Sequence, residues 1–165
     1  QQAAGRVRRG RRLARLREEL ARYFHAEAFI RPLPDEGEEA IIRRLGATLT
    51  ATGLIGEDYI ENTILRERMS STAFTDALAV PHALQMTAAR TAIAIGVADG
   101  SAAWGDGRVQ VVALAAFSES DRAAFQTVFE QLVEVFSERE SVQRIVRRAT
   151  SFESFLDELV AVIDG

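Results

Sequence analysis

The sequence contains no cysteine and no lysine, and only two histidines, three prolines and one tryptophan among its 165 residues. Without cysteine there is no disulfide, no thiolate metal site and no cysteine nucleophile. Two histidines far apart in the sequence predict no metal site either. No apolar run approaches the roughly 18 residues that a membrane-spanning helix needs. Together with the lack of an apolar signal-peptide core, these absences favour a cytoplasmic protein.

Several catalytic and nucleotide-binding motifs are absent as well. The chain has no Gly-x-x-x-x-Gly-Lys-Ser/Thr loop and no Gly-x-Gly-x-x-Gly loop, so we expect no nucleotide bound in these ways and no other cofactor. It also lacks the Gly-x-Ser-x-Gly elbow that presents a hydrolase serine. The chemistry of the protein must therefore come from another arrangement of side chains.

Charge is distributed unevenly along the chain, whose formal net charge is -4. Residues 1–24 carry 8 Arg and 2 Glu, a balance of +6, whereas residues 25–165 carry 12 Arg and 22 acidic side chains, a balance of -10. Apolar residues at helical spacing predict an amphipathic helix over 3–24. We divide the chain into a basic N-terminal linker helix, 1–24, and one domain, 25–165. Contact of this helix with nucleic acid is the less favoured alternative, because no groove-reading module accompanies its arginines.

The rest of the chain alternates helical and strand-like segments. Apolar stripes predict two helices before the main strands, one ending at Gly53 and one over 57–69, and three helices after them. The predicted strands are a short one that begins near His25 and the segments 77–83, 92–98 and 109–117. The fold class that follows is α/β, with a mixed parallel and antiparallel sheet flanked by helices on both faces.

Capping signatures mark the expected helix starts, each with a Ser, Thr or Asp followed three residues later by an acidic side chain. They are Asp35 with Glu38, Ser118 with Asp121, Ser137 with Glu140, and Thr150 with Glu153. Two Asp-Gly pairs, at 99–100 and 106–107, predict turns between the two long strands and place Trp104 in their connection.

The segment 66–82 carries chemistry that the rest of the chain lacks. It contains, in order, Arg66, Ser71, Thr72, Pro81 and His82. Arginine presents a planar charged fork that matches phosphoryl oxygens, hydroxyl groups donate further hydrogen bonds, and neutral imidazole is a nucleophile at physiological pH. Because proline cannot donate a ladder hydrogen bond, we expect His82 at the end of a strand. From spacing alone, a functional and a structural histidine are equally favoured.

These residues resemble a known family. Arg66-Glu67, Ser71-Thr72 and Ala79-Val80-Pro81-His82 are similar to the R-E-x-x-x-S-T…A-[IV]-P-H signature of type-2 EIIA domains, the fructose/mannitol class of the bacterial phosphoenolpyruvate-dependent sugar phosphotransferase system. The resemblance extends from about Ala28 to Ile163 and implies the EIIA type-2 fold. It further implies that His82 accepts a phosphoryl group from the carrier protein HPr and passes it to an EIIB component. Arg66 would stabilise the phosphoryl group, and Ser71 and Thr72 would shape the site.

Two departures from the family pattern bear on function. Transporting members carry a second histidine at the start of the helix after the long strand, and the matching position here is Phe125. The family's Gly-x-Gly before the A-I-P-H run is replaced by Phe74-Thr75-Asp76-Ala77-Leu78. Phenylalanine can carry neither a proton nor a phosphoryl group. The pattern is more similar to EIIA-like domains at the C-terminus of BglG/MtlR/LicR-type transcriptional antiterminators and activators.

The sequence therefore predicts a regulatory EIIA-like domain of a sugar-responsive transcriptional regulator, phosphorylated on His82 by HPr, and a phosphoryl acceptor rather than a turnover enzyme. The expected partners are HPr and upstream regulatory domains, with nucleic acid contacted only through other domains of a parent regulator and no membrane. One alternative is an EIIA phosphocarrier of a sugar transporter that passes the phosphoryl group to EIIB. The other is a non-catalytic interaction module with a vestigial site. Because the chain begins with Gln1 rather than Met, we expect further sequence upstream.

Overall fold

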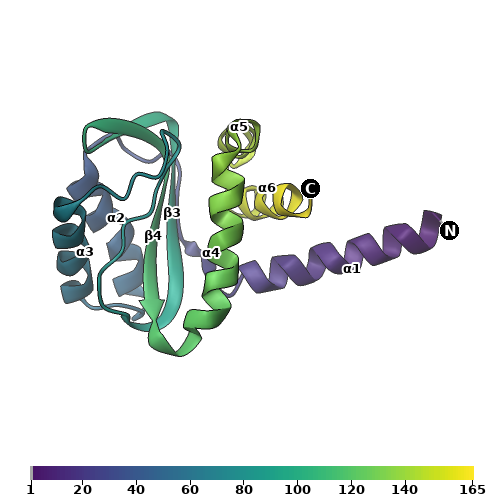
Figure 1. The fold of residues 1–165 in the computed structure, drawn as a ribbon, viewed down its shortest axis with the longest axis horizontal. Helices are drawn as coiled ribbons and strands as arrows, with labels where there is room; N and C mark the ends of the chain where they lie inside the picture. The colour runs from purple at the N-terminus through teal and green to yellow at the C-terminus, as the bar shows by residue number, and fades with distance from the viewer. Residues whose placement is uncertain (1) are drawn as a thin grey trace.

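The computed structural model describes residues 2–165. Within that range, one β-sheet lies between two layers of helices (Figure 1). The helices are α1 (Gln2–Leu20), α2 (Glu38–Ala51), α3 (Glu57–Met69), α4 (Arg122–Ser137), α5 (Arg139–Arg148) and α6 (Phe152–Asp164), with a short 3₁₀ helix, η1 (Glu119–Asp121). The strands are β1 (Phe24–Ile30), β2 (Leu78–Ala79), β3 (Thr87–Trp104) and β4 (Gly107–Ser118).

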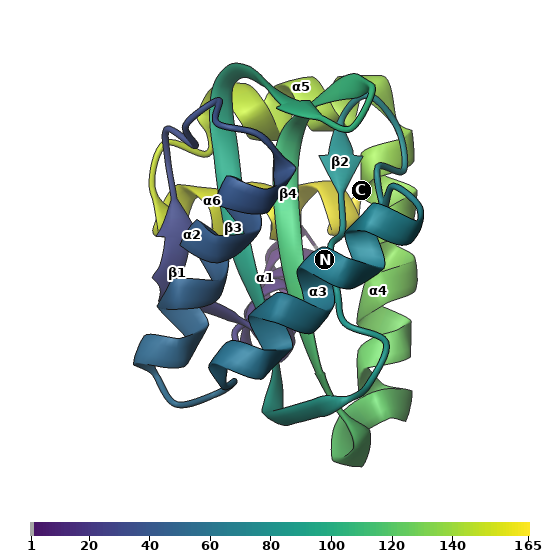
Figure 2. The same cartoon turned by 90° about the vertical axis from the view of Figure 1, so that its left-hand side faces the viewer.

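The strands form a sheet in the order β1-β3-β4-β2. β3 and β4 pair antiparallel, whereas β1 lies parallel to β3 and β2 lies parallel to β4. Helices α2 and α3 cover one face of this sheet, and α4, α5 and α6 cover the other (Figure 1 and Figure 2). The predicted α/β class, with a mixed sheet between helical layers, is confirmed.

The two long strands are apolar along most of their length because both faces of the sheet are buried. Ala94 of β3 and Leu114 of β4 belong to the core under α2 and α3, whereas their sequence neighbours Ile95 and Ala113 belong to the core under α4, α5 and α6. Successive strand residues thus serve opposite cores, as the period of two in a strand requires. The predicted segments 92–98 and 109–117 are the central parts of these two strands.

The connection between β3 and β4 differs from the sequence prediction. Asp99-Gly100 lies inside β3 instead of forming a turn, because the pairing of β3 with β4 shifts register between Val97 and Ala102 and accommodates the extra residues as a bulge. The chain turns only at residues 105–106. Trp104 therefore ends β3 and does not lie in a loop, and it is 1% exposed.

The strand predicted over 77–83 is also shorter than expected. Only Leu78 and Ala79 form β2. The chain returns to β4 at His82, through an isolated bridge to Ala115. Pro81 lies between the two points of pairing, and its missing N–H explains why the ladder is interrupted there.

The predicted capping box at the start of α2 is wrong. The helix begins after Gly37 without a side-chain cap. Asp35 instead accepts a hydrogen bond of 2.8 Å from the backbone N–H of Ala103, and Glu38 accepts one of 3.1 Å from the N–H of Gly105. Both carboxylates therefore fix the turn between β3 and β4 against α2. The hydrogen bond from Ala103 also holds the pKa of Asp35 below its usual value.

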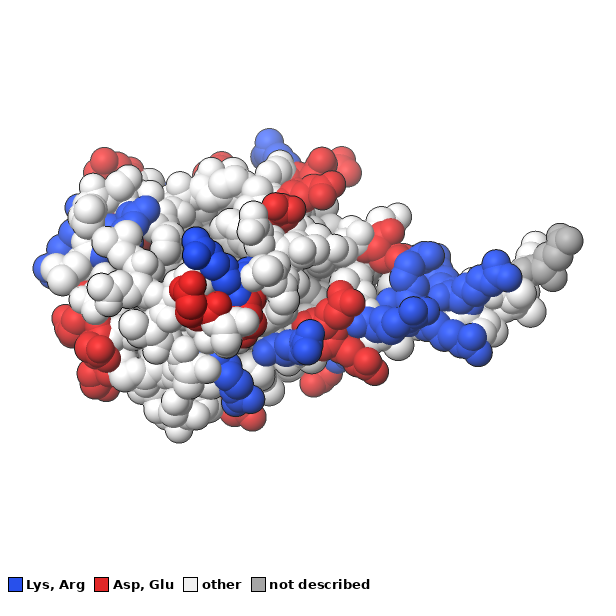
Figure 3. Space-filling view, turned by 60° about the horizontal axis from the view of Figure 1, so that its bottom comes forward, with Lys and Arg blue, Asp and Glu red and all other residues white. Residues whose placement is uncertain are grey.

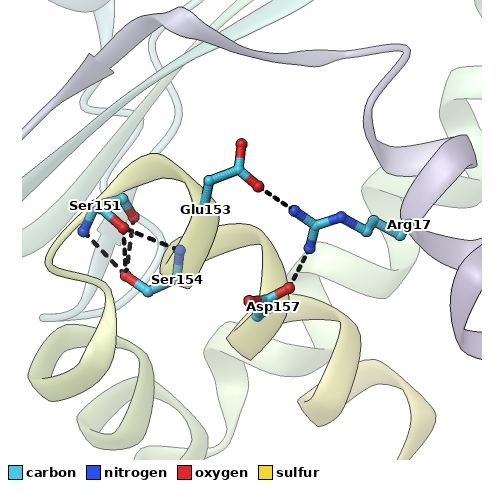
Figure 4. A network of polar contacts seen from close by, with 5 residues as sticks. All are labelled: Arg17, Ser151, Glu153, Ser154 and Asp157. Carbon is cyan, nitrogen blue, oxygen red and sulfur yellow. Dashed lines mark hydrogen bonds and ion pairs between the residues drawn. The ribbon is translucent and has the colours of Figure 1, made fainter.

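The three later capping predictions are also wrong, although the capping box observed at α6 starts only one residue after the predicted one. Ser118 makes no side-chain cap to the helical segment that follows it, and Ser137 donates back to the carbonyl of Val133 while Glu138 precedes α5. α6 does have a capping box, but it is made by Ser151 with Ser154 and not by the predicted pair that starts one residue earlier (Figure 4).

α1 projects from the body of the molecule and carries most of the arginines near the N-terminus (Figure 1 and Figure 3). It ends at Leu20, four residues before its predicted end, because Phe24 begins β1 and is 2% exposed. None of the helices within residues 2–165 combines the length and the apolar character that crossing a membrane requires.

Ion pairs attach the second half of α1 to α6. Arg17 contacts the carboxylates of Glu153 and Asp157 (Figure 4). Arg12 donates to Asp164 at 2.7 Å, and this hydrogen bond, together with the charge of the guanidinium, lowers the pKa of Asp164. Charge therefore helps to hold α1 against α6, alongside the apolar packing of Leu13, Leu16 and Leu20 in the core that α6 shares.

Candidate functional site

His82 lies three residues beyond the end of β2, where the chain meets β4 again. The backbone N–H of Ala115 donates to the carbonyl of Pro81 at 3.0 Å, and His82 itself bridges to Ala115. Pro81 is buried and His82 is half-buried. Because proline offers an acceptor but no donor, its carbonyl is the group that can join the sheet at this point. The backbone entering the imidazole is thereby fixed against a central strand.

The imidazole ring is oriented by its own backbone. Nδ1 of His82 lies 2.8 Å from the carbonyl oxygen of Val80. A carbonyl oxygen can only accept a hydrogen bond, so in the neutral ring Nδ1 carries the hydrogen and Nε2 carries the lone pair. The sequence alone does not reveal this partner of the nitrogen. The geometry therefore leaves Nε2 as the nucleophilic atom of the ring.

The imidazole lines an open hollow of about 290 Å³. Other residues that line it include Leu84, Phe117, Arg122, Phe125, Gln126 and Phe129. The ring of Phe117 lies edge-on to the imidazole with centroids 5.9 Å apart, and the ring of Phe125 lies edge-on to Phe117 at 5.1 Å. Phe125, the position at which the resemblance implies a second histidine, therefore borders the same hollow as His82.

Arg66 lies in the last turn of α3 and makes a different contact from the predicted one. Its guanidinium donates to the backbone carbonyl of Ser70 at 2.7 Å, the contact that a cation makes with the free carbonyls at a helix end. Arg66 does not line the hollow. Within residues 2–165 no hydrogen bond or ion pair joins Arg66 to His82. Its role as the phosphoryl partner stays a prediction.

Ser71 and Thr72 use their hydroxyl groups inside the loop that precedes β2. Ser71 Oγ accepts from the backbone N–H of Ala73 at 3.1 Å. The hydroxyl of Thr72 donates to Glu67 at 2.5 Å, and the Thr72 backbone N–H donates to the other oxygen of the same carboxylate at 2.7 Å. Both hydroxyls shape the loop that leads to His82, and their part in the site itself stays a prediction.

Comparison with known proteins shows the family of this chain. The family model for the phosphoenolpyruvate-dependent sugar phosphotransferase system, EIIA 2, matches residues 22–161. The chain belongs to this EIIA type-2 family. The match includes His82, Arg66, Ser71 and Thr72, and it confirms the resemblance drawn from the segment 66–82.

Relatives of this EIIA domain include both regulators and transfer proteins. The transcriptional regulator ManR of Bacillus subtilis is 28% identical over 119 residues, which cover 72% of this chain and 18% of ManR. A multiphosphoryl transfer protein of Escherichia coli O157:H7 is 30% identical over 131 residues, which cover 78% of this chain and 33% of that protein. The probable licABCH operon regulator of B. subtilis is 24% identical over 131 residues. The chain thus spans a third or less of the length of these relatives.

Solved EIIA structures share the fold. Enzyme IIA for mannitol from E. coli, solved in complex with phosphorylated enzyme IIB, has a TM-score of 0.71 at 19% identity over 84% of this chain and 99% of that one. A putative IIA domain from Streptococcus pyogenes has a TM-score of 0.73 at 18% identity over 91% of this chain and 98% of that one. At these identities the likeness establishes the common fold.

Two residues near the EIIA site are missed by sequence reasoning. Glu67 is 8% exposed and, besides its two bonds from Thr72, accepts a hydrogen bond of 3.1 Å from the indole N–H of Trp104. The signature's R-E pair contains this residue, yet spacing alone gives it no partner. Arg122 lines the hollow beside His82 although 40 positions separate them, and no local signal in the sequence links the two.

Another hollow of this EIIA domain is larger but remote from the predicted site residues. Its volume is about 490 Å³, and it lies between the loop before β2, the β3–β4 hairpin and the junction of α4 with α5. None of the predicted site residues lines it. Across residues 2–165, the side chains of His, Asp and Glu form no group of three that could hold a metal ion.

Proposed function

We propose that the chain is a regulatory EIIA domain of a cytoplasmic, sugar-responsive transcriptional regulator, and that Nε2 of His82 accepts a phosphoryl group from HPr. The ring orientation carries this proposal, because Val80 occupies Nδ1, Nε2 keeps its lone pair, and His82 lines the hollow. In the transfer, the lone pair of Nε2 forms a bond to phosphorus as the bond between phosphorus and the donor breaks, and the bonding electron pair leaves with the donor. Such a step requires an aligned nucleophile and dispersed charge more than acid–base catalysis.

Two observations favour regulation over transport. Phe125 borders the hollow at the position where the resemblance implies a relaying histidine, and a phenyl ring can neither accept a phosphoryl group nor exchange a proton. Two of the relatives are described as regulators. The multiphosphoryl transfer protein supports the alternative, an EIIA phosphocarrier that passes the phosphoryl group to EIIB.

The signal would arise from the charge that phosphorylation adds. A phosphoryl group carries about -1.5 to -2 charges at neutral pH. It would lie beside a row of aromatic rings that runs from Phe117 to Phe125 and on to Tyr23, whose ring centroid is 5.3 Å from that of Phe125. Tyr23 lies between α1 and β1. The proposal thus includes residues 1–24 as a linker helix that senses the state of the domain 25–165.

The first experiment measures transfer from phosphorylated HPr. The parent chain should acquire acid-labile label, His82→Ala should acquire none, and His25→Ala should behave as the parent because His25 lies outside the hollow. A His82→Ala chain that is labelled like the parent would remove His82 from the mechanism. An unlabelled parent would favour the interaction module with a vestigial site.

The second experiment separates regulation from transport. The labelled parent is mixed with EIIB proteins of the fructose and mannitol class, and the label on each partner is followed over time. Slow or no transfer agrees with a phosphorylation sensor. Rapid transfer to one EIIB would overturn the regulatory proposal and establish a phosphocarrier.

A further inference from the structure

The hollow at His82 contains one permanently charged side chain, that of Arg122, among the residues that line it. Arg122 is the first residue of α4, and Gln126, one turn later on the same helix, lines the hollow as well. Side chains four positions apart lie on one face of a helix, so Arg122 and Gln126 border the same space. The other residues named in the lining are largely apolar, so Arg122 is the residue there that can offer a positive charge to an anion.

The guanidinium of Arg122 is available for a new partner. Its ion pair, with Glu119, is loose at 3.7 Å, and the two side chains are 70% and 73% exposed. Pairs of this kind contribute little, because water screens them and both side chains lose freedom on pairing. The next carboxylate, Asp121, is already bonded to the hydroxyl and the backbone N–H of Thr91. A dianion in the hollow would therefore compete only with the weakly held carboxylate of Glu119 for the guanidinium of Arg122.

We propose that Arg122 binds the oxygens of the phosphoryl group carried by Nε2 of His82. The proposal rests on His82 being the phosphoryl acceptor and adds a residue that the family resemblance does not assign to the site. The guanidinium fork matches two phosphoryl oxygens. One further feature supports the contact: Gln126 can donate an amide hydrogen bond to a third oxygen. Arg66 donates to the carbonyl of Ser70 and does not line the hollow.

The test uses chemical phosphorylation, so that it does not depend on HPr. Phosphoramidate transfers its phosphoryl group to imidazole: the lone pair of Nε2 forms the new bond to phosphorus, the P–N bond of phosphoramidate breaks, and ammonia leaves. The ³¹P signal of phosphorylated His82, identified by its loss in His82→Ala, is then titrated with pH. The variants are Arg122→Gln, Arg66→Gln and, as matched control, Arg139→Gln, which changes the exposed first residue of α5.

A cation in contact with the phosphoryl group favours its dianion and lowers its pKa. We expect Arg122→Gln to raise the phosphoryl pKa by about 0.5 to 1, corresponding to a roughly threefold to tenfold loss of preference for the dianion, and Arg139→Gln to leave it unchanged. A purely structural role of Arg122 would alter stability without moving this pKa. Identical titration of Arg122→Gln and the parent would overturn the proposal, as would a shift seen in Arg66→Gln alone.

The same experiment distinguishes failure of this inference from failure of the proposed function. A parent chain that phosphoramidate labels at His82 and HPr does not would refute the donor while leaving the contact with Arg122 measurable. A parent chain that phosphoramidate cannot label at His82 would show that Nε2 does not open to the hollow, and that result would overturn the contact with Arg122.

Discussion

Replacing Glu67 with alanine tests whether one buried carboxylate holds the His82 segment in place. Glu67 lies in α3, is 8% exposed, and accepts three hydrogen bonds. Two come from Thr72, at 2.5 Å and 2.7 Å, and one comes from the indole N–H of Trp104 at 3.1 Å. Trp104 is 1% exposed, so water cannot replace the acceptor that its N–H would lose.

The cost can be worked out bond by bond. A buried donor left without an acceptor costs about 1 to 3 kcal/mol, and each bond from the partly exposed Thr72 contributes about 0.5 to 1.5 kcal/mol. Removing the carboxylate also removes its own desolvation cost, which offsets part of the loss. We expect Glu67→Ala to lower the free energy of unfolding by about 3 kcal/mol. For a chain of this length, that corresponds to a Tm lower by about 6 to 12 °C.

Thermal unfolding followed by circular dichroism and by the fluorescence of Trp104, the one tryptophan of the chain, measures this change. The control is Glu61→Ala, which removes an exposed carboxylate of the same helix that pairs with Arg43 at 2.5 Å, and which should melt close to the parent. A double-mutant cycle of Glu67→Ala and Trp104→Phe, followed by circular dichroism because Trp104→Phe removes the fluorophore, gives the coupling energy of this pair. If Glu67→Ala has the same Tm as Glu61→Ala and the parent, the three hydrogen bonds do not hold the His82 segment in place, and the reasoning is refuted.

Three further predictions concern packing, pH and the hollow. Gly96→Ala should destabilise the protein by about 1 to 3 kcal/mol, measured by urea unfolding, because a Cβ there would lie 2.6 Å from Leu33 Cδ1 in the core. The contact between Arg12 and Asp164 lowers the pKa of the carboxyl below its usual value of 3.8. The stabilisation from this contact is therefore present above about pH 4 and is lost as pH falls through the lower pKa of the folded state. Hydrogen exchange of α1 should show this loss, and Arg12→Gln should reduce it, since Arg9 also pairs with Asp164. Phe125→His should cost about 2 kcal/mol of packing and increase transfer of label to EIIB, and no gain in transfer would remove Phe125 from the distinction between sensor and carrier.

The parts of the fold that the sequence predicts well are those decided by local pattern. The segment 57–69 is predicted and observed as α3 with the same bounds, because its apolar spacing is helical and Gly56 precedes it. The two long strands are recognisable as unbroken apolar runs, since burial on both faces leaves no alternation to obscure them. The position of His82 follows from Pro81, whose missing donor ends the regular pairing of β2.

The parts that fail depend on groups distant in sequence. Asp35 and Glu38 match a capping box. In the structure they instead accept hydrogen bonds of 2.8 Å and 3.1 Å from backbone N–H groups at the turn after β3. The role of Arg66 as a phosphoryl partner is not among these failures, because its bond to the carbonyl of Ser70 leaves that role a prediction. A sequence pattern shows which bonds a side chain can make, but it does not show which competing partner the fold brings within reach.

Arg122 cannot be linked to His82 from the sequence for the same reason, because only the fold brings the two residues to one hollow. The end of β4 brings the start of α4 to His82, so Arg122 and Phe125, three positions apart on one helical face, both border the hollow. Phenylalanine stands where the resemblance implies a second histidine, and none of the other residues that line the hollow beside His82 can take up a phosphoryl group. The arginine can still neutralise charge. If Arg122 binds the phosphoryl group as proposed, the site would stabilise phosphorylated His82 without offering it an onward acceptor. That combination suits a domain that reports its phosphorylation state better than one that passes the phosphoryl group on.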